Sequence, residues 1–152
     1  MARLINSGNY AAPLTNGDEI RFVEGMKYGY ITETITPDGS ATYDLEEKLP
    51  AGAVVLACEV KLSATVVATT AVKIGVGRKE TTADPDKYAL TSALTAATYR
   101  GTKITVTPVL GDASAEETIQ VVACDTNGAA AGTLNSGGDI TVKLWYRVTE
   151  TW

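Results

Sequence analysis

An alternation of polar and apolar residues over residues 49–62 constrains the fold of this chain more than any other feature of its sequence. The segment reads LPAGAVVLACEVKL and begins with a Pro-Ala-Gly turn. Glu59 and Lys61 point to one side of the expected strand, and the apolar residues of the other side are Val54, Leu56, Cys58, Val60 and Leu62. Because successive side chains of a strand point to opposite faces, the pattern predicts a sheet with one buried face.

Similar strand patterns recur along the chain between short turn sequences. Thr and β-branched residues dominate these runs, as is typical of strands, and Gly, Pro, Asp and Asn cluster between them. The predicted strands are residues 19–23, 28–36, 41–45, 53–63, 71–76, 103–110, 117–124 and 139–150. About eight short strands at this spacing predict an all-β, antiparallel sandwich or barrel. Residues 84–86 are expected to form a turn, and residues 88–97 could form one short helix.

The size and composition of the chain favour a single domain with a thin core. The chain has 152 residues, and 45% of them are hydrophobic, mostly Ala and Val, with a single Phe. A core poor in large aromatic residues is typical of two sheets packed face to face. We therefore expect residues 19–152 to form a β-sandwich domain.

Residues 1–18 have no sustained periodicity and are expected to form an extended N-terminal arm. Their apolar residues are Leu4, Ile5, Tyr10 and Leu14, among several Asn, Gly and Pro residues. A frayed terminus is one interpretation. An arm that docks on a partner is the other, because a purely solvated tail would not need these apolar residues.

The last predicted strand places a tryptophan on the face that should meet water. Ile140, Val142, Leu144, Tyr146 and Val148 are expected to face inward, so Trp145 faces outward between Lys143 and Arg147. The two cationic side chains could simply cover the ring. Alternatively, Trp145 contacts a partner, since Trp and Arg are enriched in protein interfaces. Trp152, at the end of the chain, is a second candidate for a partner contact.

The sequence offers little catalytic or ligand-binding chemistry, and we expect no enzyme, cofactor or metal. Without histidine, the chain lacks the commonest general base and the usual nucleophile activation. Carboxylates cluster at Asp84 and Asp86 and at Asp112, Glu116 and Glu117, where turn formation is the simpler explanation. Cys58 and Cys124 are expected to be free, buried thiols.

The net charge of −5 disfavours nucleic-acid binding, because phosphate recognition requires cations. We also expect no membrane span and no signal peptide, since no sufficiently long apolar run is found. The protein is therefore expected to be made in a host cytoplasm and used there, or carried out within a larger assembly.

The phrases GSATYDL, LPAGAVVLA, KIGVG and DPDKY, in this order, resemble small structural proteins of tailed bacteriophages. These are jelly-roll-like capsid decoration (cement) or head-fibre proteins, and the resemblance covers residues 30–150. It implies a virion protein on the capsid surface that binds the major capsid protein, reinforces the capsid and forms homotrimers. It assigns no role to individual residues.

Two alternatives to capsid decoration remain open on the sequence. One is a glycan- or receptor-binding jelly-roll module of a tail fibre, for which exposed aromatic residues such as Tyr28 and Tyr30 are candidates. The other is a different head or tail structural subunit of the same particle, with residues 78–101 as the only candidate for a long stacking loop.

Overall fold

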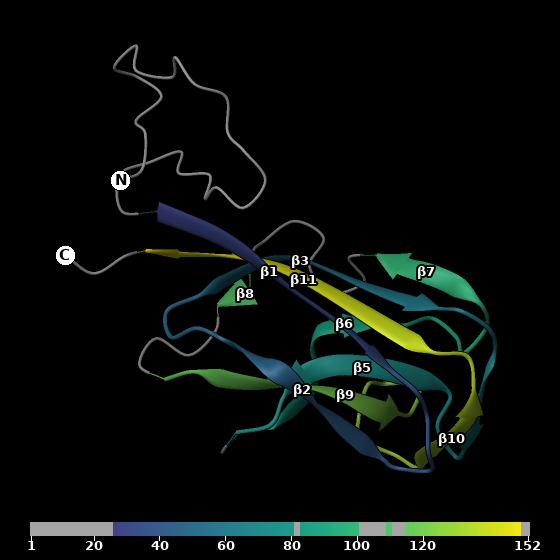
Figure 1. Ribbon diagram of the computed structural model, residues 1–152. Coiled ribbons are helices and arrows are strands. Elements are labelled where there is room, and N and C mark those ends of the chain that lie inside the picture. The colour runs from purple at the N-terminus through teal and green to yellow at the C-terminus, as the bar shows by residue number, and fades with distance from the viewer. Residues whose placement is uncertain (1–25, 81–82, 101–108, 111–114, 150–152) are drawn as a thin grey trace, which may run out of the picture.

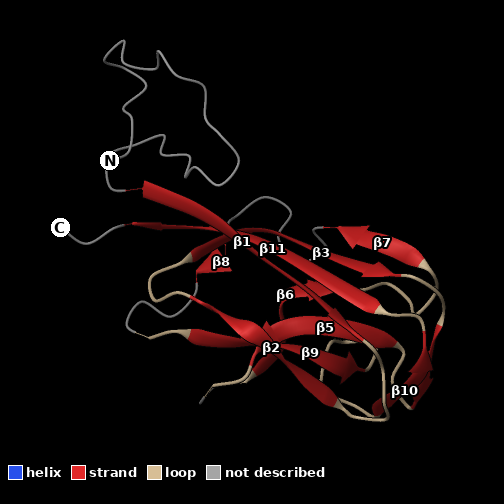
Figure 2. Ribbon diagram, viewed as in Figure 1, coloured by secondary structure: helices blue, strands red, loops and turns tan. Residues whose placement is uncertain are grey.

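A computed structural model describes residues 26–80, 83–100, 109–110 and 115–149 of the chain. Within these residues it consists of strands, turns and loops, and no helix is present (Figure 2). The strands are β1 (Met26–Ile35), β2 (Thr42–Leu49), β3 (Val54–Leu62), β4 (Val66–Thr69), β5 (Lys73–Arg78), β6 (Asp84–Leu90), β7 (Ala97–Arg100), β8 (Val109–Leu110), β9 (Glu117–Cys124), β10 (Thr133–Gly137) and β11 (Ile140–Thr149).

Two antiparallel sheets pack face to face to form a sandwich (Figure 1). One sheet has the strand order β1-β11-β3-β7, with β8 also paired to β3, and the other has the order β2-β9-β5-β6. Strands β4 and β10 form a separate two-stranded ribbon. The pairs β1–β11, β2–β9, β3–β7 and β5–β6 nest inside one another along the sequence, which is the connectivity of a jelly roll. The prediction of an all-β, jelly-roll-like sandwich is confirmed.

The inner faces of the two sheets form the core. On β11, Ile140, Val142 and Leu144 are completely buried, as the alternation predicts. The opposite sheet contributes the buried residues Ile74, Val76, Ile119 and Val121. Aliphatic side chains of this size fill the space between two sheets, which lie about 10 Å apart.

The register of β3 differs from the prediction in its first half. Cys58, Val60 and Leu62 are buried as expected, but Val54 and Leu56 are only half-buried and Val55 takes the buried position. A β-bulge is responsible, because Trp145 pairs with Ala57 whereas Tyr146 pairs with Val55. The extra residue, Leu56, reverses the alternation for the residues before it.

Two predictions between residues 84 and 97 are wrong. Residues 84–86 begin strand β6 and do not form a turn, and residues 88–97 contain no helix. Pro85 is compatible with a strand here because β6 lies at the edge of its sheet. Tyr88 and Ala89 face the core and are completely or almost completely buried.

Several predicted elements cannot be compared with the structure. The predicted strand 19–23 and the arm, residues 1–18, lie outside the described residues, as do residues 103–108. Strands β4, β7 and β10 were not expected from the sequence pattern, since they are short and rich in Thr, Ala, Ser and Gly.

Candidate interaction surface

An exposed aromatic pair lies on the outer face of the β1-β11-β3-β7 sheet. Tyr30 of β1 is 61% exposed, and Trp145 of β11 is 36% exposed. The two residues are directly opposite each other in the antiparallel register, and Ala57 of β3 is opposite Trp145 on its other side. Residues paired in this way have adjacent side chains on the same face. Ala57 therefore contributes a small side chain next to Trp145 on this face.

Charged residues occupy the neighbouring positions of the same face. Lys143 is the next outer-face residue of β11 before Trp145. It is directly opposite Glu59 of β3, and Glu59 is opposite Arg100 of β7. The Nε of Arg100 donates to a carboxylate oxygen of Glu59 at 2.7 Å. In the other direction, Tyr28 is opposite Arg147. The aromatic pair is therefore flanked by charged side chains in both directions along the strands.

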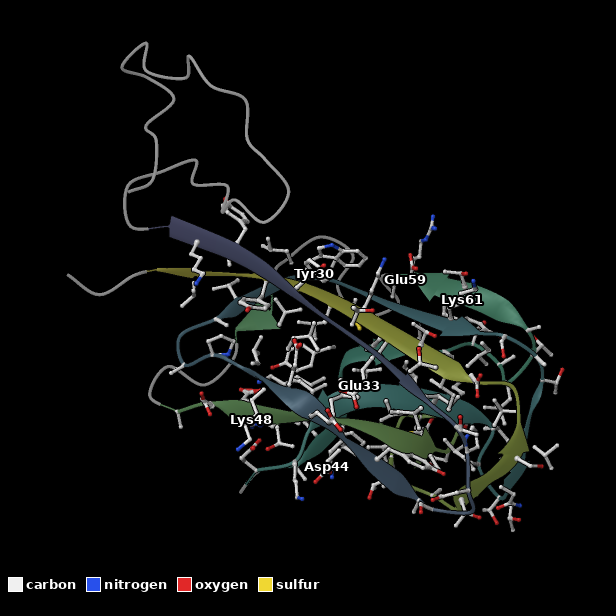
Figure 3. The ribbon with its side chains drawn as sticks, viewed as in Figure 1. Tyr30, Glu33, Asp44, Lys48, Glu59 and Lys61 are labelled. Atoms are coloured by element: carbon white, nitrogen blue, oxygen red, sulfur yellow. The ribbon has the colours of Figure 1, made fainter. Side chains whose placement is uncertain are left out.

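This face carries more cations than carboxylates, although the chain as a whole has a net charge of −5. Among the described residues, this face has one carboxylate, that of Glu59, and four cations, those of Lys61, Arg100, Lys143 and Arg147. The side chain of Arg100 is 78% exposed. Figure 3 shows Tyr30, Glu59 and Lys61 on the outer side of this sheet, with Asp44 and Lys48 on the other sheet. Most acidic residues of the described part of the chain therefore lie elsewhere on the molecule.

The structure brings together only part of the predicted partner-binding set. Trp145 lies on the outer face, as its position in the alternation predicts. Leu4, Ile5, Tyr10, Leu14 and Trp152 lie outside the described residues. Sequence reasoning missed the contributions of Ala57 and Arg100 and the pairing of Tyr30 with Trp145. These depend on which strands become neighbours, and no local pattern specifies that.

Among the carboxylates that the sequence singled out, Glu117 has the most contacts in the described structure, and Asp112 lies outside the described residues. Glu117 is completely buried, and its carboxylate accepts a hydrogen bond from the Tyr88 hydroxyl at 2.6 Å. The Nζ of Lys87 lies 3.2 Å from the same carboxylate, and a guanidinium nitrogen of Arg78 lies 3.7 Å from it. Burial, followed by the contact with Glu117, raises the pKa of the Tyr88 hydroxyl. One carboxylate and two cations thus form a buried charged cluster that joins β5, β6 and β9.

The two cysteines are free and buried, as expected. Burial raises the pKa of the Cys58 thiol to about 12 and that of the Cys124 thiol to about 11. Both thiols are therefore protonated at neutral pH, and a protonated thiol is a poor nucleophile and metal ligand.

Across the described part of the chain, no group of three or more His, Cys, Asp or Glu residues is arranged to hold a metal. The same residues include no helix that could cross a membrane.

Comparisons with known proteins identify the fold. No family model and no curated protein matches the sequence. A chain in the acidic stable capsid structure of Helicobacter pylori bacteriophage KHP30 is similar in structure, with a TM-score of 0.56 and 12% sequence identity over 86% of this chain and 92% of that chain.

Two further capsid structures contain similar chains. In the cyanophage Pam1 capsid, the TM-score is 0.47 at 16% identity, over 93% of this chain and 94% of that chain. In the capsid of Ralstonia phage GP4, it is 0.47 at 17% identity, over 95% and 94%.

Proposed function

We propose that the protein is a structural component of a bacteriophage particle that binds the outer surface of the capsid and reinforces it. The observation that carries the proposal is the jelly-roll fold, which the chain shares over most of its length with a chain of the KHP30 capsid structure. The outer sheet face, with its exposed aromatic pair, supplies a surface suited to a protein partner. The partner is the major capsid protein, and no enzymatic activity is required for this role.

Reinforcement follows from mass action. A protein that binds only the assembled lattice lowers the free energy of that lattice in proportion to the occupied sites, and the lattice stabilises the bound fold in return. Residues 1–18 supply a second contact in this proposal, because Leu4, Ile5, Tyr10 and Leu14 are apolar residues in a segment without the periodicity of a strand.

We also propose that the protein acts as a homotrimer on the capsid. Among the described strands, β1 and β7 form the edges of one sheet, and β2 and β6 form the edges of the other. Subunits around a symmetry axis can cover such edges, which otherwise promote uncontrolled pairing. Light scattering after gel filtration measures the mass directly, and a monomer at all concentrations and on the capsid would refute the trimer.

The function is tested with capsids that lack the protein, assembled from the major capsid protein of the same genome. Purified protein should sediment with these capsids to a saturating ratio and raise the temperature at which they disrupt. A variant lacking residues 1–14 should keep the far-ultraviolet spectrum of the sandwich and lose most of its binding. The proposal fails if the full-length protein does not sediment with capsids and its removal leaves their heat resistance unchanged.

A further inference from the structure

We infer that the outer face of the β1-β11-β3-β7 sheet docks on an acidic protein surface that offers an apolar recess, repeated over the capsid lattice. We call this face the aromatic face and define it by Tyr30, Ala57, Lys143, Trp145 and Arg147. The inference rests on the proposed function and adds the surface used and the chemistry of the partner. The contact is separate from any made by residues 1–14.

The exposed aromatic pair supports a protein partner. Tyr, Trp and Arg are the residues most enriched among those that dominate binding energy in interfaces, and all three types are present on this face. Tyr30 and Trp145 are two of the four exposed large hydrophobic residues of the described chain; the others are Val67 and Val72. Next to Trp145, Ala57 contributes only a methyl group to the face. A partner that covers the rings removes their remaining exposed area from water.

The charges of the aromatic face favour a partner whose surface is negatively charged. Lys143 and Arg147 flank Trp145 on β11, whereas the face has Glu59 as its carboxylate, already in contact with Arg100 at 2.7 Å. A cationic patch attracts an acidic surface and repels another cationic patch, including the same face of a second copy. Attraction between these surfaces increases the rate of association at low salt.

A second copy of this chain is a less suitable partner than the capsid. Its most acidic described strand is β2, which carries Asp44, Glu46 and Glu47. Asp44 is already bound to Lys79 and Gln120 of its own chain. Moreover, β2 presents none of the exposed large hydrophobic residues. It therefore offers charge to the aromatic face without an apolar counterpart for the rings.

Capsid sedimentation with four variants tests the inference. Trp145→Ala and Tyr30→Ala remove the rings, and Lys143→Glu reverses a charge beside them. Val67→Ala is the matched control, because Val67 is 54% exposed on β4, outside this sheet. Thermal unfolding of each free protein reports whether the fold is retained, and Tyr30→Ala and Lys143→Glu carry the test if Trp145→Ala does not fold.

Trp145→Ala should weaken capsid binding roughly 30-fold or more, as expected for a dominant interface residue. Tyr30→Ala should have a smaller effect and weaken capsid binding roughly 10-fold. Lys143→Glu should weaken binding at low salt, with a smaller effect at high salt because ions screen exposed charges. Val67→Ala should bind like the wild type.

The outcomes separate this inference from the function on which it rests. Absence of wild-type binding overturns both. Wild-type binding that all three face variants retain overturns the inference alone. If Trp145→Ala instead dissociates an oligomer of the free protein and leaves capsid binding intact, the face is a contact between copies and the inference is wrong.

Discussion

The buried ion pair at Glu117 allows the stability of the sandwich to be tested quantitatively. Replacing Glu117 by Gln keeps the size of the side chain and removes its charge. The side chain of Lys87 is only 12% exposed and that of Arg78 is 22% exposed, so both cations would lose a buried counter-ion. The Tyr88 hydroxyl could still donate to the amide oxygen. Breaking a buried pair costs about 3–5 kcal/mol, and we expect the lower end because the two cations keep some access to water.

The expected cost of about 3 kcal/mol corresponds to a melting temperature roughly 6–12 °C lower for a domain of this size. Urea unfolding of wild type and Glu117→Gln, followed by tryptophan fluorescence, measures the difference. Glu59→Gln is the matched control, because it makes the same change in an ion pair whose partner Arg100 is 78% exposed, and such pairs are worth about 0–1 kcal/mol. If Glu117→Gln costs no more than Glu59→Gln, the cluster is not a major source of stability and the reasoning is wrong.

Three further predictions concern the buried thiols, a close approach of the backbone at Gly77 and the surface carboxylate of Asp44. The thiols of Cys58 and Cys124, with pKa values raised by burial to about 12 and about 11, should not react with a disulfide reagent at pH 8 in the folded protein and should both react in urea; fast reaction without urea would contradict their burial. Gly77→Ala should destabilise the fold by about 2–3 kcal/mol in urea unfolding, since a Cβ there would overlap a backbone oxygen of β6 and overpacking costs this much; an unchanged midpoint would refute the close approach. The pKa of Asp44 is lowered, chiefly by its hydrogen bond with Lys79, so its contribution to stability is present above the unfolded pKa and is lost as the pH falls through the folded pKa. Asp44→Asn should therefore cost under about 1 kcal/mol at pH 7, because both partners are exposed, and nothing at pH 2; a cost that persists at pH 2 would show that the charge is not its source.

The sequence was sufficient to predict the fold class and most of the long strands. Strand β9 has the predicted bounds, residues 117–124, and β11 alternates as expected from Ile140 to Trp145, whereas Tyr146 and Val148 are only half-buried. In these strands, each residue's face is dictated by a period-two pattern and a single buried side, which is local information. The exposed position of Trp145 follows from the same pattern, so this part of the candidate surface was predictable.

Other features depend on contacts that no local pattern contains. Leu90 and Leu94 are four residues apart, a spacing that suits one face of a helix. The residues up to Leu90 nevertheless form strand β6, because they pair with β5. The bulge at Leu56 arises where β3 meets β11, and the Tyr30–Trp145 pair requires strands more than a hundred residues apart in sequence to become neighbours. Tertiary pairing decides these cases.

The pairing of β1 with β11 also has a consequence for the order of folding. The strand that begins at Met26 can complete its ten residue pairs only after the strand that ends at Thr149 has been synthesised. Contacts between residues so distant in sequence are slow to form, because a long loop must close before they become favourable. During translation, the nascent chain therefore exposes strand edges until its last strand leaves the ribosome. The yield of folded protein should depend strongly on chaperones and on expression temperature, whereas the stability of the folded protein should not depend on chaperones.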